Sequence, residues 1–160
     1  MQARDVRIPF KPKGLHKGER MNIKIKELVD GCMPVEMKQG DWIDLKAACD
    51  VIMFEGEYQE IPLGIAMQLP DGFEAHVAPR SSTFKRYGIL CANSFGVIDN
   101  SFCGDGDQWC FPAYATRRTE IPKGSRICQF RVIENQPEIV FDRVETLGNA
   151  DRGGLGSTGY

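Results

Sequence analysis

The stretch Asn22-Ile23-Lys24-Ile25-Lys26 alternates polar and apolar side chains, as a β-strand with one buried face does. No segment shows the sustained 3.6-residue periodicity of a long helix; the best helix candidate is residues 81–87, which Pro79 precedes and whose serines could cap it. Glycines and prolines recur at short intervals along the rest of the chain. Between them lie further strand-like segments, at 43–53, 61–69, 74–78, 88–91, 109–115, 126–133 and 139–144. This pattern predicts an all-β sandwich, jelly roll or barrel with at most one short helix.

The composition is that of one globular domain. The chain has 160 residues, of which 42% are hydrophobic and 26% charged, and its net charge of −2 gives no overall basic field for nucleic acid. Its apolar runs are too short for a membrane-spanning helix or a secretory signal, so we expect a cytoplasmic location. The six cysteines form no CxxC pair, which favours reduced thiols over a zinc site.

The two ends of the chain differ from its middle. Residues 1–20 hold six basic and two acidic side chains, a local charge of +4. We interpret this segment as a mobile extension ahead of a domain at 21–147, with a nucleic-acid-binding arm as the alternative. The glycine-rich residues 148–160 are typical of a flexible terminus. An arginine, glycines and hydroxyls together are also typical of a segment that folds over phosphates.

Three further segments carry polar side chains suited to chemistry. Arg80 and the two following serines stand at the start of the expected helix, where they could bind phosphate or simply cap it. Asp99 follows two apolar residues in the segment 93–105 and could deprotonate a water or only cap a turn. Arg126 and Gln129, after a turn, could serve a polar site or an ordinary sheet edge.

Taken together and in order, these motifs resemble the trimeric all-β dUTPases. The motifs are PRSS at 79–82, an asparagine before GVID at 93–99, GSRICQ at 124–129 and RGG-x-GSTG at 152–159. The family's first motif corresponds to DWIDL at 41–45, where Trp42 replaces the usual glycine, as in a branch found in some Gram-positive bacteria and their phages. The resemblance covers residues 21–160.

The resemblance implies a jelly-roll homotrimer that hydrolyses dUTP to dUMP and pyrophosphate with Mg²⁺, at sites shared between subunits. It makes Asp99 the general base, and it makes Asp44 the residue that orients a water bound to Mg²⁺, without touching the ion itself. It assigns the phosphates to Arg80, Ser81, Ser82 and Gln129, supported by Arg126, with the tail residues Arg152, Gly156, Ser157 and Thr158 closing over the γ-phosphate. It assigns uracil and deoxyribose to a hairpin that includes Asn93, Gly96, Val97, Ile98 and Phe102.

Three residues depart from the family pattern. Phe102 stands where a tyrosine is usual, and Cys103 where a longer polar side chain is common. Leu155 stands where the tail usually supplies a phenylalanine that stacks on uracil, so another aromatic residue should cover the base. We expect this lid to be Trp109 or Phe111, with Phe95 as the third candidate.

Two other functions stay open. One is a regulatory protein-binding role on the dUTPase scaffold, which could coexist with catalysis. The other is a dCTP deaminase-like activity, against which Asp99 and the complete tail motif argue. We expect no membrane association and no stable binding of nucleic acid.

Overall fold

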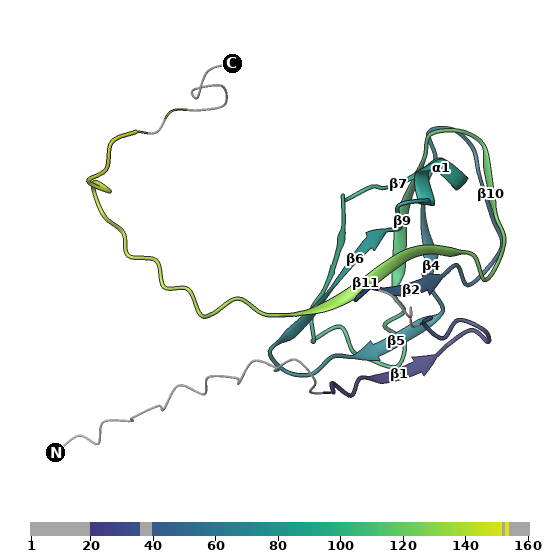
Figure 1. Ribbon diagram of the computed structural model, residues 1–160, viewed down its shortest axis with the longest axis horizontal. Helices are drawn as coiled ribbons and strands as arrows, with labels where there is room; N and C mark the ends of the chain where they lie inside the picture. The colour runs from purple at the N-terminus through teal and green to yellow at the C-terminus, as the bar shows by residue number, and fades with distance from the viewer. Residues whose placement is uncertain (1–19, 36–39, 152, 154–160) are drawn as a thin grey trace.

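The computed structural model describes residues 20–35, 40–151 and 153. The expectations for residues 1–19 and for the tail residues Arg152, Gly156, Ser157 and Thr158 therefore lie outside the described residues. Within them the chain is almost entirely β-structure with one short helix, which confirms the predicted fold class (Figure 1). No helix in this part of the chain is long and apolar enough to cross a membrane.

The elements follow one another closely along the chain, and their bounds are β1 (Lys24–Glu27), β2 (Ile43–Lys46), β3 (Val51–Met53), β4 (Tyr58–Pro62), β5 (Ile65–Gln68), β6 (Phe73–Pro79), α1 (Thr83–Tyr87), β7 (Ile89–Cys91), β8 (Gly96–Ile98), β9 (Cys110–Ala115), β10 (Thr119–Ile121) and β11 (Arg126–Glu134). All strand pairings are antiparallel. The largest sheet has the order β2-β11-β6-β8, and a second has the order β4-β9-β7. Two two-stranded sheets, β1-β5 and β3-β10, complete the domain.

Apolar side chains from all four sheets form the core. Trp109, next to β9, is 0% exposed, and Phe130 on β11 is 2% exposed. Their ring centroids lie 5.4 Å apart in an edge-to-face arrangement, which is a favoured geometry for aromatic pairs. This contact links the sheet that carries β11 to the sheet that carries β9.

Two of the expected strands are each divided in two. The segment 43–53 forms β2 and β3, and the segment 61–69 forms the end of β4 and then β5. The second break occurs at Gly64, whose φ of 71° lies in the left-handed region. A Cβ at this position would lie 2.7 Å from the Cys32 Sγ atom, so only glycine fits both the turn and the contact.

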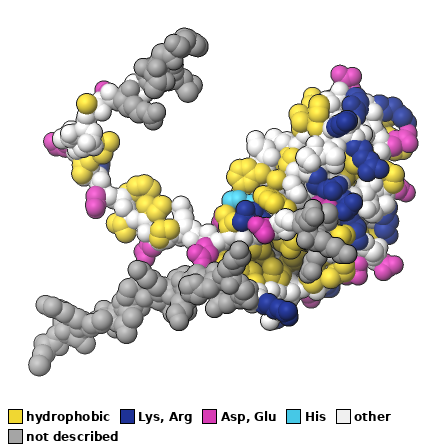
Figure 2. Space-filling view, viewed as in Figure 1, with side chains coloured by type: hydrophobic (Ala, Val, Ile, Leu, Met, Phe, Trp, Pro, Cys, Tyr) yellow, Lys and Arg dark blue, Asp and Glu magenta, His cyan; other side chains and the backbone are white. Residues whose placement is uncertain are grey.

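The strand expected at 139–144 does not form in the single chain. After β11 ends at Glu134, residues 135–151 contain no helix or strand, and they extend away from the domain as a C-terminal arm (Figure 1). Apolar side chains lie along this arm, visible in yellow in Figure 2. Phe141 is 91% exposed and Leu147 is 83% exposed. A strand needs a pairing partner, and the isolated chain provides none for this segment.

Candidate active site

A buried carboxylate holds two arginines at one end of the largest sheet. Asp44 on β2 is 2% exposed. Its Oδ1 atom lies 2.9 Å from Arg80 Nε, and its Oδ2 atom lies 3.1 Å from Arg126 Nη1. Arg80 follows β6 and Arg126 begins β11, so the strand order β2-β11-β6 brings the three residues together. A buried charge needs such pairing, and we call Asp44, Arg80 and Arg126 the arginine clamp.

Gln129 lies beside the arginine clamp. On β11 it pairs with Asp44 on β2, and residues directly opposite in an antiparallel pair share one face of the sheet. Its Nε2 atom donates a hydrogen bond to the Pro79 carbonyl at 3.4 Å, which holds the amide against the strand end that leads to Arg80. The structure therefore gathers Asp44, Arg80, Arg126 and Gln129, which the sequence assigned to phosphate and Mg²⁺.

The turn after β6 is fixed by Thr83 rather than by the serines. Thr83 Oγ1 accepts a hydrogen bond from the Arg80 backbone N–H at 3.0 Å and donates one to the Ile127 carbonyl at 2.7 Å. The expectation that a serine caps the helix is wrong, because Ser82 at the N-cap makes no side-chain capping bond and α1 begins only at Thr83. Ser81 and Ser82 are both exposed, so their hydroxyls can take hydrogen bonds from outside the chain.

A second group of predicted residues forms a pocket at another place. Residues of β8 and its flanking loops line this cavity. They are Asn93, Gly96, Val97, Ile98 and Phe102. The cavity has a volume of about 460 Å³, which is within the range that small-molecule sites occupy. The sequence motifs did not indicate its other lining residues, which include Tyr58 and Glu60 on β4, Cys110 on β9, and Gln108 just before β9.

Asp99 follows β8 directly, between the pocket residues Ile98 and Phe102. Its Oδ1 atom accepts a hydrogen bond from the Ser101 backbone N–H at 2.8 Å and another from the Ser101 hydroxyl. Because these hydrogen bonds stabilise the charged form, they hold the pKa of Asp99 below its usual range. The exposed carboxylate is therefore ionised at neutral pH and able to accept a proton.

The two groups of residues are far apart within one chain. Ile98 pairs with Ala75, so Asp99 lies level with Glu74 on β6, whereas Arg80 follows the other end of the same strand. Six residues of extended strand separate these two levels by about 20 Å, at roughly 3.3 Å per residue. A single phosphorus atom cannot contact both Asp99 and Arg80 of one chain. The arginine clamp and the pocket beside Asp99 are therefore two separate groups within one chain, and we call each of them a half-site.

The structure corrects two of the three lid candidates. Trp109 and Phe111 are each 0% exposed, so neither ring can cover a bound base without opening the core. Phe95 is 48% exposed, and its ring lies 5.2 Å from the His76 ring, measured between centroids. Of the three candidates, Phe95 is the one whose ring is available at the surface.

The family model for dUTPases matches residues 31–159. The match spans the arginine clamp, the pocket lined by residues of β8, and Asp99. The chain belongs to the dUTPase family. Family membership confirms the resemblance that the sequence motifs indicated.

The relatives include prophage and bacterial enzymes. The chain is 56% identical over 140 residues to the SPbeta prophage-derived deoxyuridine 5'-triphosphate nucleotidohydrolase YosS of Bacillus subtilis, covering 87% of this chain and 99% of that protein. It is 34% identical over 151 residues to the deoxyuridine 5'-triphosphate nucleotidohydrolase of Wolbachia pipientis, covering 88% and 97% of the two chains.

Solved phage structures share the fold. The Staphylococcus bacteriophage 80alpha dUTPase with dUPNHPP superposes with a TM-score of 0.72 at 18% identity, over 87% of this chain and 99% of that one. A mutant dUTPase from phage phi11 of S. aureus, whose structure reveals the coordination of a structural Mg(II) ion, gives a TM-score of 0.69 at 15% identity, over 79% and 98%.

Proposed function

We propose that this protein hydrolyses dUTP to dUMP and pyrophosphate, with Asp99 deprotonating the water that attacks the α-phosphorus. The observation that carries this proposal is the position of Asp99. This ionised carboxylate directly follows the strand whose residues line a nucleoside-sized pocket. A water held by Asp99 would lie next to the first phosphate of a nucleotide whose base and sugar occupy that pocket. Both YosS and the Wolbachia protein carry the name of this activity.

The arginine clamp supplies the positive charge that phosphoryl transfer needs. Arg80, with the exposed hydroxyls of Ser81 and Ser82 and with Gln129, would bind the α- and β-phosphates. Arg126 and Asp44 hold the Arg80 guanidinium in a fixed orientation. Because donors fixed before the reaction need no reorganisation during it, such a clamp stabilises the charge that develops in the transition state.

Mg²⁺ fits this donor set as an ion held mainly by the triphosphate. Among the described residues, no three His, Cys, Asp or Glu side chains converge as a metal site. Mg²⁺ commonly keeps several waters and binds through substrate phosphates with few protein carboxylates. The two oxygens of Asp44 have about four lone-pair positions, of which the arginines use two. Asp44 can therefore also accept a hydrogen bond from a Mg²⁺-bound water, and the ion would neutralise charge on the phosphates.

The pocket would set the choice of base and sugar. Backbone groups of Gly96, Val97 and Ile98, with Asn93, would pair with the edge of uracil. Cytosine would present an amino group where uracil presents a carbonyl, and buried polar groups that lack a partner give strong discrimination. Phe102 would pack against deoxyribose, and Phe95 would cover the base in place of the usual tail phenylalanine.

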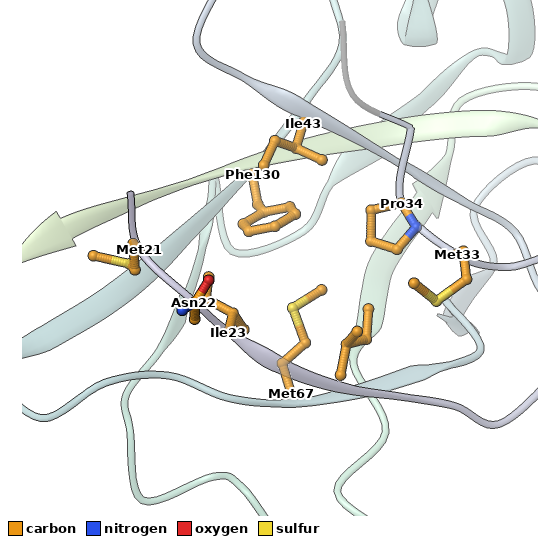
Figure 3. Close-up of a pocket in the computed structure, with 9 residues that line it drawn as sticks. Met21, Asn22, Ile23, Met33, Pro34, Ile43, Met67 and Phe130 are labelled. Carbon is orange, nitrogen blue, oxygen red and sulfur yellow. The ribbon is translucent and has the colours of Figure 1, made fainter. Parts of the chain in front are cut away.

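The separation of the half-sites supports active sites shared between copies, and the resemblance to the trimeric dUTPases implies that the assembly is a homotrimer. Asp99 of one copy and Arg80 of another would meet across the interface. The exposed apolar side chains of the C-terminal arm are surfaces that association would bury. The same holds for an apolar groove of about 370 Å³ lined by residues such as Met33, Ile43, Met67 and Phe130 (Figure 3).

The remaining parts of the chain take the roles that the motifs indicate. Residues 21–147 form the catalytic domain, and residues 148–160 close over the γ-phosphate through Arg152, Gly156, Ser157 and Thr158. Residues 1–20 are a basic extension ahead of this domain. The reaction takes place in the cytoplasm, where it removes dUTP from the pool used for DNA synthesis and supplies dUMP.

A regulatory protein partner is a second function compatible with catalysis. The observation that favours it is the likeness to Staphylococcus phage dUTPases that control the transfer of virulence genes. A dCTP deaminase-like activity is not favoured, because YosS and the other curated relatives carry the name of dUTP hydrolysis.

The test of the proposed function is pyrophosphate release from dUTP, dCTP, dTTP and UTP with Mg²⁺, for the unmodified protein and for Asp99→Asn. We expect the unmodified protein to hydrolyse dUTP selectively and Asp99→Asn to lose this activity. The circular dichroism spectra of the two proteins should be the same, which shows that the variant folds. Equal use of all four nucleotides, or full activity in the Asn variant, would refute the proposal.

A further inference from the structure

Cys91 lies beside the pocket without lining it. It ends β7, and its side chain contacts the side chain of Asn93, which does line the pocket. The Cys91 Sγ atom lies 3.4 Å from Asn93 Oδ1, within the range of a hydrogen bond from a thiol. This is the one hydrogen bond of the Asn93 side chain within the part of the chain that the structure describes.

The backbone fixes the two residues in this relation. Cys91 pairs with Ala113 on β9, and the Ala92 N–H donates to the Pro112 carbonyl at 2.8 Å. The Ser94 N–H then donates to the Cys91 carbonyl at 3.0 Å, which closes a turn in which Ser94 has a φ of 66°. The sheet therefore anchors Cys91, while the exposed Asn93 side chain depends on Cys91 for its orientation.

The direction of the hydrogen bond follows from the protonation of the thiol. Burial raises the pKa of Cys91, and a backbone hydrogen bond from Asn93, which lowers it, is the smaller effect. The sulfur therefore carries its proton at neutral pH and donates to Oδ1. With Oδ1 engaged by the thiol, the two donors of the NH₂ group remain available to a ligand in the pocket that Asn93 lines.

We propose that Cys91 is a positioning residue for base selection, which holds the Asn93 amide so that its NH₂ group meets a carbonyl oxygen of uracil. This inference rests on the proposed function. It adds to it the residue that orients the Asn93 NH₂ group as a hydrogen-bond donor. Uracil offers a carbonyl oxygen at position 4, whereas cytosine offers an amino group, and two donors facing each other cannot pair. Without the thiol, the amide can rotate and present its oxygen to cytosine instead.

The test is a double-mutant cycle on Cys91 and Asn93, read as kcat/KM for dUTP and for dCTP, the latter at high enzyme concentration. We expect Cys91→Ala to lower the preference for dUTP about threefold to tenfold, as removal of one hydrogen bond does. In the Asn93→Ala background, the same substitution should change the preference less than about twofold, because the group it orients is gone. Cys91→Ser, which keeps a donor, should retain the preference, and the matched control Cys49→Ala, at an exposed thiol, should match the unmodified protein.

Each outcome decides between the inference and its alternatives. An equal effect of Cys91→Ala in both backgrounds would show that the residue acts through packing and would overturn the inference. Loss of preference in Cys91→Ser would overturn it as well. If Cys91→Ala does not fold, Cys91→Val replaces it in the cycle, with the same expectations. Absence of dUTP hydrolysis by the unmodified protein would instead refute the proposed function, and the inference with it.

Discussion

Replacing Asp44 with asparagine tests the arginine clamp directly. Asparagine has nearly the same shape as aspartate but has no charge, and one of its two terminal atoms is an NH₂ group. In the clamp, each carboxylate oxygen contacts a different arginine, Arg80 through Nε at 2.9 Å and Arg126 through Nη1 at 3.1 Å. In Asp44→Asn, one arginine therefore keeps an acceptor, and the other faces a donor.

The size of the effect follows from the burial of the three side chains. The Asp44 side chain is 3% exposed, whereas the side chains of Arg80 and Arg126 are 22% and 42% exposed. A hydrogen bond to a charged group contributes about 1.5–3 kcal/mol to stability. Loss of a fully buried ion pair costs about 3–5 kcal/mol, but water screens Arg126, so the lower range applies. We expect Asp44→Asn to lower the free energy of unfolding by about 1.5–3 kcal/mol.

The assay combines urea denaturation at fixed protein concentration with dUTP kinetics. Because Arg80 loses its fixed orientation, the KM for dUTP should rise along with the loss of stability. The matched control is Glu120→Gln, which removes an ion pair of 2.6 Å to Arg118 in which both side chains are about 60% exposed. Such a surface pair contributes about 0–1 kcal/mol. If Asp44→Asn denatures and turns over dUTP like the control, Asp44 does not hold the arginines.

Three further predictions concern other parts of the site. Because Ser101 lowers the pKa of Asp99, Ser101→Ala should raise that pKa towards its usual value and move the acid limb of the kcat/KM profile for dUTP to higher pH; an unmoved limb would contradict this. Phe95→Ala should raise the KM for dUTP about tenfold, since stacking on a base contributes about 1–3 kcal/mol. Phe111→Ala, in the core, should instead lower the free energy of unfolding by about 3–5 kcal/mol. Unchanged KM in Phe95→Ala would exclude it as the lid. Deletion of residues 152–160 should abolish turnover while the circular dichroism spectrum stays the same, and a fully active truncated protein would refute the role of the tail.

The sequence predicted several strands almost to their ends. The prediction for 126–133 corresponds closely to β11 (Arg126–Glu134), and that for 74–78 to β6 (Phe73–Pro79). The prediction of one strand each was wrong at 43–53 and 61–69, where turns interrupt segments rich in apolar residues. Hydrophobicity alone does not distinguish a buried turn from a buried strand, and the contact of Gly64 with Cys32 arises only in the folded chain.

The sequence indicated the members of the site but not how they are arranged. Asp44 and Arg126 are 82 residues apart, so their contact depends on the order of strands in the sheet. For the same reason, the sequence did not point to Tyr58 and Cys110. They line the pocket from β4 and β9 but belong to none of the sequence motifs. Trp109 and Phe111 ranked ahead of Phe95 as lid candidates because an isolated sequence does not show that both belong to the core.

We infer that dUTP is hydrolysed where Asp99 of one copy meets Arg80 of another. The most direct measurement mixes Asp99→Asn and Arg80→Ala proteins, each inactive alone, and refolds them together in equal amounts. Random association should place an intact Asp99 and an intact Arg80 in about a quarter of the sites, so dUTP turnover should return to about a quarter of the unmodified rate. Turnover no higher than the sum of the two separate variants would contradict an active site shared between copies.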